Sequence, residues 1–381
     1  MNKKKFIFLV ILLFSARFSI LAQNNRKLEL LIKSSNVEMY ENPDKVIATG
    51  LNIIKLSNNN VNLKIKAYKL VSDGYSSKRD YQKSLEFLIK ALELLPKSED
   101  ELLKISINTK AGIQYHQLNI YQSSITYLDK AEKMCVEYPF RDSVRSFLGI
   151  NYLVRGFIYK EKLNCDIAIS FFDKGIQELS YNNKTLENAT RISIAKYNKG
   201  NCYLLTEEID LAGQSFKEAL KYAKSVNAKS LEAFALKGIA QIHTLNGTYV
   251  DAIDELNKAY SIAINVKDLV LNQEIYKGLS ENYLAINQLE KYKEYQQKLI
   301  QTQTKLKENE RASIENLLLE NKNNLDEIAK TKFSNFWITV FLFLTISIPL
   351  ISLYIIKKNN KNIRELIKKI NKIEPNFKSL N

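Results

Sequence analysis

Residues 65–98 read IKAYKLVSDGYSSKRDYQKSLEFLIKALELLPKS, and this stretch decides the fold because its residue pattern recurs along most of the chain. The pattern is that of a helix–turn–helix unit of about 34 residues, in which small side chains lie where the two helices touch. Its positions are Tyr68, Val71, Ser72, Tyr75, Ser84, Leu88, Ala91 and Pro96. We therefore expect a stack of helical hairpins.

Two independent series of positions track the repeat along the chain. In the first helix a small residue is followed three positions later by a ring: Ser72/Tyr75, Gly112/Tyr115, Gly156/Tyr159, Gly200/Tyr203, Ala240/His243 and Ser280/Tyr283. The steps between these pairs are 40, 44, 44, 40 and 40 residues. The second helix keeps the same spacing as Ser84/Leu88/Ala91, Ser124/Leu128/Ala131, Ala168/Phe172/Gly175, Ala212/Phe216/Ala219 and Ala252/Leu256/Ala259. Two series with one spacing are hard to obtain by chance.

This pattern resembles the tetratricopeptide repeat, and the resemblance implies an all-α superhelix of about six to seven helical hairpins. The composition agrees, because 11 Gly and 5 Pro in 381 residues are few for the turns of an all-β fold. Small residues let paired helices approach closely, and we expect the Tyr or Phe rings to fill the gap to the next pair. Steps longer than the usual repeat predict extended helices or longer loops.

The net charge of +15 does not indicate nucleic-acid binding once it is located. Residues 1–22 carry +4 and residues 357–381 carry +6, which leaves about +5 for the middle of the chain. No Cys/His pattern with metal-ligand spacing is present, so we expect no metal or cofactor. The three cysteines, Cys135, Cys165 and Cys202, are expected to be small buried packing residues.

The N-terminal region precedes the repeats. Residues 1–22 have a lysine cluster, a short apolar run and Ala22 at a potential cleavage point, which is typical of a bacterial signal peptide; an uncleaved anchor is the alternative. Residues 23–64 contain the Asn42–Pro43 turn signal and an apolar face, and predict a degenerate capping hairpin. The repeat array itself is expected over residues 65–300.

The C-terminal region predicts a membrane anchor. Residues 301–335 form a helical stalk that is either a short dimerising coiled coil or a plain amphipathic helix. Residues 336–356 are uncharged and predict one transmembrane helix. Three Lys/Arg precede it within 20 residues and seven follow it, which places the basic tail, residues 357–381, in the cytoplasm and on the anionic leaflet. The array would then lie outside the cytoplasmic membrane.

This order of segments resembles bacterial membrane-anchored regulators, in which an extracytoplasmic repeat array is joined to an AraC-type or LuxR-type DNA-binding domain or to a histidine kinase. The stretches YENPDKVIATGLNIIKLSNNN, SSKRDYQKSLEFLIKALEL and NYLVRGFIYKEKLNCDIAISFFDKG look particularly like the AraC-linked group. The resemblance covers about residues 1–370, and the output domain that it implies has no counterpart in this sequence. Transcription-factor activity is therefore not carried over.

Tetratricopeptide arrays usually bind extended peptides or helices in a groove lined by the first helices. The template positions that face such a groove predict a partner-binding set: Ile113, His116, Leu153, Phe157, Lys160, Tyr197, Asn198, Asn201, Lys237 and Gln241, with Lys69 and Asp73 further toward the N-terminus. Apolar anchors next to amides suit an extended segment. A groove occupied only by its own solvated side chains is the alternative.

Three other residues depart from the template. Arg155 and Lys199 place a charge where the template has an apolar residue, so each is either a partner-binding residue or a side chain that runs along the surface. His243 takes the place of a repeated Tyr and is expected to be a packed core histidine.

Two functions follow from these features. The first is a membrane-anchored, non-enzymatic scaffold that holds a protein or peptide. The second is a sensory component that signals through its span to a separate cytoplasmic partner, or a regulator truncated before its DNA-binding domain. No nucleophile–base pair or phosphate-binding Gly loop indicates an enzyme.

Overall fold

The computed structural model describes residues 23–36, 38–39, 42–57, 60–181, 185–266 and 268–377. These residues are helices joined by short turns, with no β-strand among them, which confirms the all-α prediction. The predicted signal peptide lies outside the described residues. The chain divides into two compact units at residues 302 and 303, and each is described separately.

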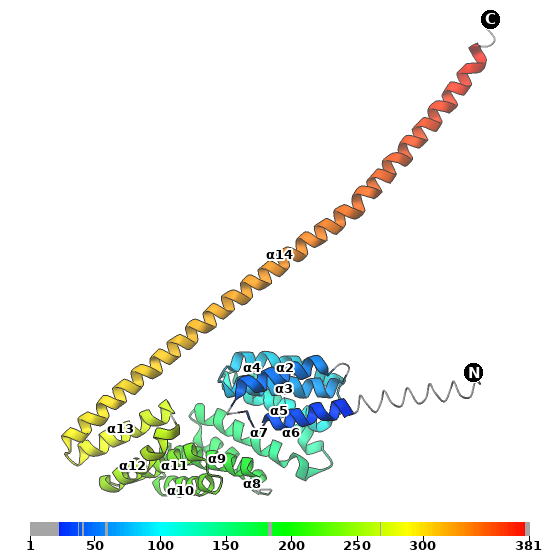
Figure 1. Cartoon of the computed structure of the whole chain (residues 1–381). Coiled ribbons are helices and arrows are strands. Elements are labelled where there is room, and N and C mark those ends of the chain that lie inside the picture. The colour runs from blue at the N-terminus through cyan, green and yellow to red at the C-terminus, as the bar shows by residue number, and fades with distance from the viewer. Residues whose placement is uncertain are drawn as a thin grey trace. The chain divides into compact units, whose positions relative to one another are not determined.

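The first unit is a series of antiparallel helical hairpins (Figure 1). A helix of residues 23–36 precedes α2 (Pro43–Leu56). The following first helices are α3 (Val61–Ser77), α5 (Glu101–Gln117), α7 (Arg141–Glu161), α9 (Leu186–Leu205), α11 (Lys229–Leu245) and α13 (Leu269–Ala285). The second helices are α4 (Tyr81–Leu94), followed by the short η1 (Leu95–Lys97), α6 (Tyr121–Glu137), α8 (Cys165–Ser180), α10 (Ile209–Ser225), α12 (Tyr249–Val266) and the start of α14 (Leu289–Phe377).

A three-residue turn joins the first to the second helix in each of six hairpins. Its middle residue has a positive φ: Arg79, Asn119, Leu163, Glu207, Gly247 and Asn287. In each turn the third residue donates its N–H to the carbonyl of the ring position, as in Asp80 to Tyr75 at 3.0 Å. The turns follow one another at the spacing of the sequence repeat. The first 44-residue step therefore comes from the longer helix α7, with 21 residues, and the second from α9, with 20 residues, together with a longer connection between α8 and α9. The turns within the hairpins keep their length.

The small residues of the repeat lie where the helices of a hairpin touch. A Cβ at Gly156 would lie 2.5 Å from the Phe172 ring, and one at Gly200 would lie 2.6 Å from the Phe216 ring. In the first full repeat, Ser84 Oγ donates to the carbonyl of Ser72 at 2.7 Å, so two buried hydroxyl residues replace glycine and alanine there. The predicted close approach is confirmed.

The ring position packs differently from the prediction. Tyr75, Tyr115, Tyr159 and Tyr283 stack on a ring twelve residues later in their own hairpin, with centroids 5.4 to 5.6 Å apart. These four tyrosines therefore pack within their own hairpin, whereas the Phe216 ring reaches both Gly200 of its own hairpin and Gly238 of the next first helix.

The environment of His243 also differs from the prediction, which was a packed core histidine. The residue twelve positions later is Glu255, so no ring is available for it to stack on. Its side chain is 35% exposed, and Nδ1 lies 2.9 Å from Thr248 Oγ1. The imidazole also lines a cavity of about 550 Å³ between α10 and α11. His243 is a half-exposed residue in the last turn of α11, not a core histidine.

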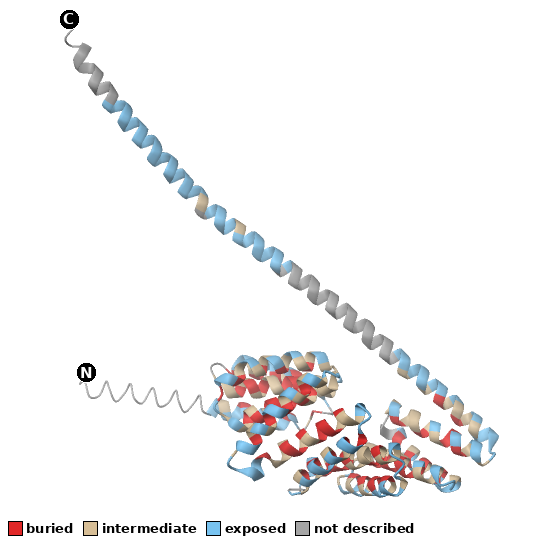
Figure 2. Ribbon diagram, turned by 180° about the vertical axis from the view of Figure 1, so that it is seen from behind, coloured by how far each residue is buried: buried red, intermediate tan, exposed pale blue. Residues whose placement is uncertain are grey.

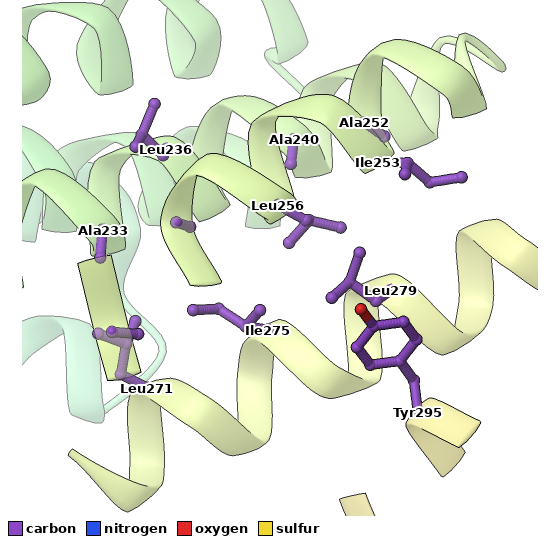
Figure 3. Close-up of a cluster of buried hydrophobic side chains, with 12 residues drawn as sticks. Ala233, Leu236, Ala240, Ala252, Ile253, Leu256, Leu271, Ile275, Leu279 and Tyr295 are labelled. Atoms are coloured by element: carbon purple, nitrogen blue, oxygen red, sulfur yellow. The ribbon is translucent and has the colours of Figure 1, made fainter. Parts of the chain in front are cut away.

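The last hairpin completes the array through an apolar cluster shared by α11, α12, α13 and the start of α14 (Figure 3). Leu256, Ile275 and Leu279 are fully or almost fully buried, and the Tyr295 ring covers one end of the cluster. Burial of such side chains contributes about 1.5–3 kcal/mol each. Tyr295 thus ties α14 to the repeats although the small residues of the template are absent from it.

The second unit, residues 303–381, contains the rest of α14, which is helical to Phe377. In the described part of the chain, one helical stretch, Lys332–Lys368, has the length and apolar composition to cross a membrane. Most of its described apolar residues are exposed, as Figure 2 shows by colour. Phe341 and Phe343 are 67% and 71% exposed, so protein contacts do not account for this apolar surface.

Candidate functional site

Five first helices place a side chain at one equivalent position of the repeat. These residues are Asp73 on α3, Ile113 on α5, Phe157 on α7, Asn201 on α9 and Gln241 on α11. Four are half-buried and Gln241 is exposed. We call the surface that they and their neighbours on the first helices form the first-helix face. In Figure 1, α8 and α10 lie along the lower edge of the repeats with α7 and α9 above them.

The N-terminal end of the first-helix face is a charged cluster. Asp73 accepts from Lys69 Nζ at 2.6 Å and lies 2.7 Å from Lys110 Nζ on the next first helix. Burial alone would raise the pKa of Asp73, but the attraction of Lys110 and Lys69 outweighs it and lowers the pKa to about 2. These charges satisfy one another and join α3 to α5.

His116 and Phe157 meet in the next part of the face. Their ring centroids are 6.0 Å apart, and Phe157 packs in turn against Phe172 at 5.4 Å. His116 Nε2 lies 3.3 Å from Glu161 Oε1. Phe157 therefore presents a half-buried apolar surface with an imidazole and a carboxylate beside it.

Lys160 and Asn198 link α7 to α9. Lys160 Nζ donates to Asn198 Oδ1 at 2.6 Å, and Asn198 Nδ2 donates to the carbonyl of Ile194 at 2.8 Å. Burial lowers the pKa of Lys160. No ion pair involves this ammonium among the described residues. A partly buried cation with a neutral acceptor retains capacity to bind an anionic group.

Tyr197 and Lys237 link α9 to α11. The Tyr197 ring packs against Phe216 and Phe234, each with centroids 5.6 Å apart, and Lys237 Nζ donates to its hydroxyl at 3.4 Å. Lys237 Nζ also lies 3.5 Å from Glu274 Oε2 on α13. This lysine is thus held by groups on both neighbouring helices.

Asn201 and Gln241 differ from their neighbours on the face. Neither side-chain amide has a hydrogen-bond partner within the described part of the chain. Each amide can donate and accept, which matches the alternating N–H and C=O groups of an extended backbone. They are the two residues of the face whose polar groups are wholly available to a partner.

Two of the predicted groove residues are buried elsewhere. Leu153 is 4% exposed and packs against the site of Gly175, because α7 and α8 approach closely there. The side chain of Arg155 is 10% exposed, and Nη2 binds Asp129 and Glu132 of α6 while Nε binds Asn151. Both are corrected to structural residues.

Lys199, like Arg155, forms an ion pair with the preceding second helix. Its Nζ lies 2.5 Å from Asp173 Oδ1, on the preceding second helix. Ile113 remains on the first-helix face but is partly covered by an apolar cluster that includes Val154 and Ile158.

Sequence reasoning missed the residues that connect one first helix to the next. Lys110, Glu161 and Glu274 supply charges to the face, and Thr244 Oγ1 donates to Asn282 Oδ1 at 3.0 Å. No group of three or more His, Cys, Asp or Glu side chains within the described residues is placed to hold a metal ion.

Comparisons with known proteins identify the fold. No family model and no curated protein matches the chain. A signal-transduction ATPase with numerous domains and a tetratricopeptide repeat sensor, from Pyrococcus horikoshii, matches with a TM-score of 0.59 and 17% identity, over 74% of this chain and 41% of that one. The chain thus spans less than half of that protein.

Two weaker matches are RapI in its apo form, with a TM-score of 0.48, 16% identity and coverage of 64% and 99%, and TPR-like kinesin light chain repeats from Podosopora anserina, with a TM-score of 0.40, 13% identity and coverage of 55% and 99%. At these identities only the fold is shared. The chain has a tetratricopeptide-like repeat fold.

Proposed function

We propose that the chain is a non-enzymatic, membrane-anchored scaffold that binds an extended protein or peptide segment on its first-helix face. The observation that carries the proposal is the set of Lys160, Asn201 and Gln241 on the first helices α7, α9 and α11. It combines a cation without a carboxylate partner and two amides without hydrogen-bond partners among the described residues. Phe157 and Tyr197 add half-buried rings that suit an apolar side chain.

The anchor is the stretch 336–356 within Lys332–Lys368, supported by its length, its apolar composition and its exposed side chains. The excess of Lys/Arg after it supports a topology in which the tail, residues 357–381, lies in the cytoplasm of a bacterium and the array lies on the other side of the inner membrane. The basic tail would lie on the anionic lipid surface, and the stalk would allow a homodimer.

Substitution of the two amides tests the scaffold. Asn201→Arg with Gln241→Arg adds bulk and charge to the first-helix face without touching the core. We expect crosslinked partner recovery from native membranes to fall about tenfold or more. Gln214→Arg, at an exposed position on α10, serves as the matched variant and should leave recovery unchanged. Unchanged recovery with the double variant would show that the face is not the binding surface.

A sensory role is the second candidate, and the continuity of α14 favours it. This helix runs unbroken from the last hairpin, through the apolar stretch, into the basic tail. A helix of this kind can couple the array to a separate cytoplasmic partner. Deletion of residues 357–381 separates the two roles, because a scaffold keeps its phenotype and a receptor loses it.

A further inference from the structure

Two of the three cysteines in the chain belong to one buried apolar cluster at the joint between two repeats. Cys165 is the first residue of α8, and Cys202 lies on α9 of the next repeat. Both are buried in one apolar cluster, at 7% and 0% exposure, and the Cys165 thiol contributes to the raised pKa of Cys202. Cys135 belongs to a different cluster and has no cysteine beside it in the described residues.

The repeat explains why these two positions meet. Cys165 lies three residues before the small residue of its second helix, and Cys202 lies two after the small residue of the next first helix. The same two positions meet at the neighbouring joints: Gln114 Nε2 donates to the carbonyl of Tyr81 at 3.2 Å, Ile158 and Tyr121 share an apolar cluster, and Ile242 and Ile209 line one cavity. The proximity of the two thiols is therefore a property of the fold.

From this juxtaposition we infer that Cys165 and Cys202 form a disulfide that staples the third full repeat to the fourth when the chain meets a small-molecule disulfide such as oxidised glutathione. One thiolate attacks a sulfur of the oxidant and displaces a glutathione thiolate. The second thiol loses its proton and attacks the mixed disulfide, which releases the second glutathione. The protein loses two hydrogens in total, and its two electrons reduce one glutathione disulfide to two thiols.

The surroundings of the pair set the rate of this reaction. Burial, together with the neighbouring Cys165 thiol, raises the pKa of Cys202 to about 12, and the ammonium of Lys160 opposes this shift. A buried thiol that holds its proton reacts slowly, so oxidation follows local opening of the joint or accompanies folding. The staple also crosses the joint that Lys160 and Asn198 span on the first-helix face. The topology proposed above would expose the chain to an oxidising compartment, where disulfides persist.

Counting free thiols in the purified full-length chain tests the staple. The chain is incubated in detergent with oxidised glutathione or with dithiothreitol. It is then denatured in the presence of an alkylating reagent, and its mass is measured by intact mass spectrometry. We expect three alkylated cysteines after reduction and one after oxidation, together with a linked peptide pair that contains residues 165 and 202. Thermal unfolding of the oxidised chain should shift to higher temperature.

Two variants and a second route of oxidation make the outcome decisive. Cys135→Ser should leave no free thiol after oxidation, whereas Cys202→Ser should leave two. Refolding in a glutathione redox buffer lets glutathione reach both thiols before they are buried. Three free thiols after both native oxidation and refolding, or a bridge that involves Cys135, would overturn the inference.

Discussion

Nη2 of Arg155 on α7 lies 2.5 Å from Oδ1 of Asp129 on α6, so a charge that breaks the repeat template joins two consecutive hairpins. The equivalent pair one repeat later, Lys199 and Asp173, has the same distance. Each cation runs from a first helix to the second helix before it, and its stem is buried on the way. These residues therefore serve the stack and leave the first-helix face to other side chains.

We expect Arg155→Ala to lower the free energy of unfolding by about 1–3 kcal/mol, because it removes buried packing and leaves two carboxylates without their cation. Arg155→Leu restores the template residue and should cost less than about 1 kcal/mol. Urea denaturation measures both, and partner recovery should be normal in each. A loss of recovery with Arg155→Leu, without loss of stability, would return Arg155 to the binding surface.

Gly200 on the first helix α9 and Gly213 on the second helix α10 allow the same substitution to be compared at a tight and at an open position. Gly200→Ala places a Cβ 2.6 Å from the Phe216 ring, so we expect a loss of about 1–3 kcal/mol in the free energy of unfolding. Gly213→Ala meets its nearest atom at 3.7 Å and should stabilise the chain by up to about 1 kcal/mol through helix propensity. Thermal unfolding of the two variants gives the sign of each effect. Equal effects would contradict the close approach at Gly200.

Leu163 occupies the middle of a hairpin turn with a φ of +56° and is 80% exposed. A leucine in this left-handed conformation is strained, and its side chain has little packing to lose. We expect Leu163→Gly to raise the free energy of unfolding by about 1 kcal/mol, and Leu163→Val, with a branched Cβ, to lower it. The midpoint of urea denaturation reports both changes, and a lower midpoint for Leu163→Gly would refute the account of the turn.

Asp73 makes stability depend on pH in the acid range. Its folded pKa of about 2 lies below the ordinary value of 3.8, so its contribution is complete above about pH 4 and is lost as the pH falls through 2. We expect Asp73→Asn to be less stable than the unsubstituted chain by about 2 kcal/mol at pH 6, since it leaves Lys110 without its carboxylate. The difference should shrink between pH 4 and pH 2 in urea titrations. A difference independent of pH would show that Asp73 acts through packing.

The repeat was predictable from sequence because its positions depend on local chemistry. Gly156 and Gly200 fall where two helices touch, and the spacing between such residues equals the spacing between the turns. The stacking partners of Tyr75, Tyr115, Tyr159 and Tyr283, twelve residues later, were also readable from the sequence. At His243 that partner is Glu255, which already indicated that this histidine would not be enclosed.

The candidate site was predictable only in part. A template position indicates the direction of a Cβ atom, and on this basis Phe157, Asn201 and Gln241 are predicted to share one face of α7, α9 and α11. The template position does not predict which residues the end of a long side chain contacts. Arg155 is held by Asp129, 26 residues earlier, and such a pairing depends on how two hairpins pack.

Site-specific photocrosslinking tests the central claim, binding on the first-helix face, most directly. A photoreactive amino acid is placed at position 201 on α9 or at position 214 on α10, and the full-length chain is irradiated in native membranes. The account predicts a discrete crosslinked partner from position 201 and none from position 214. A partner captured from position 214 alone, or equally from both positions, would contradict it.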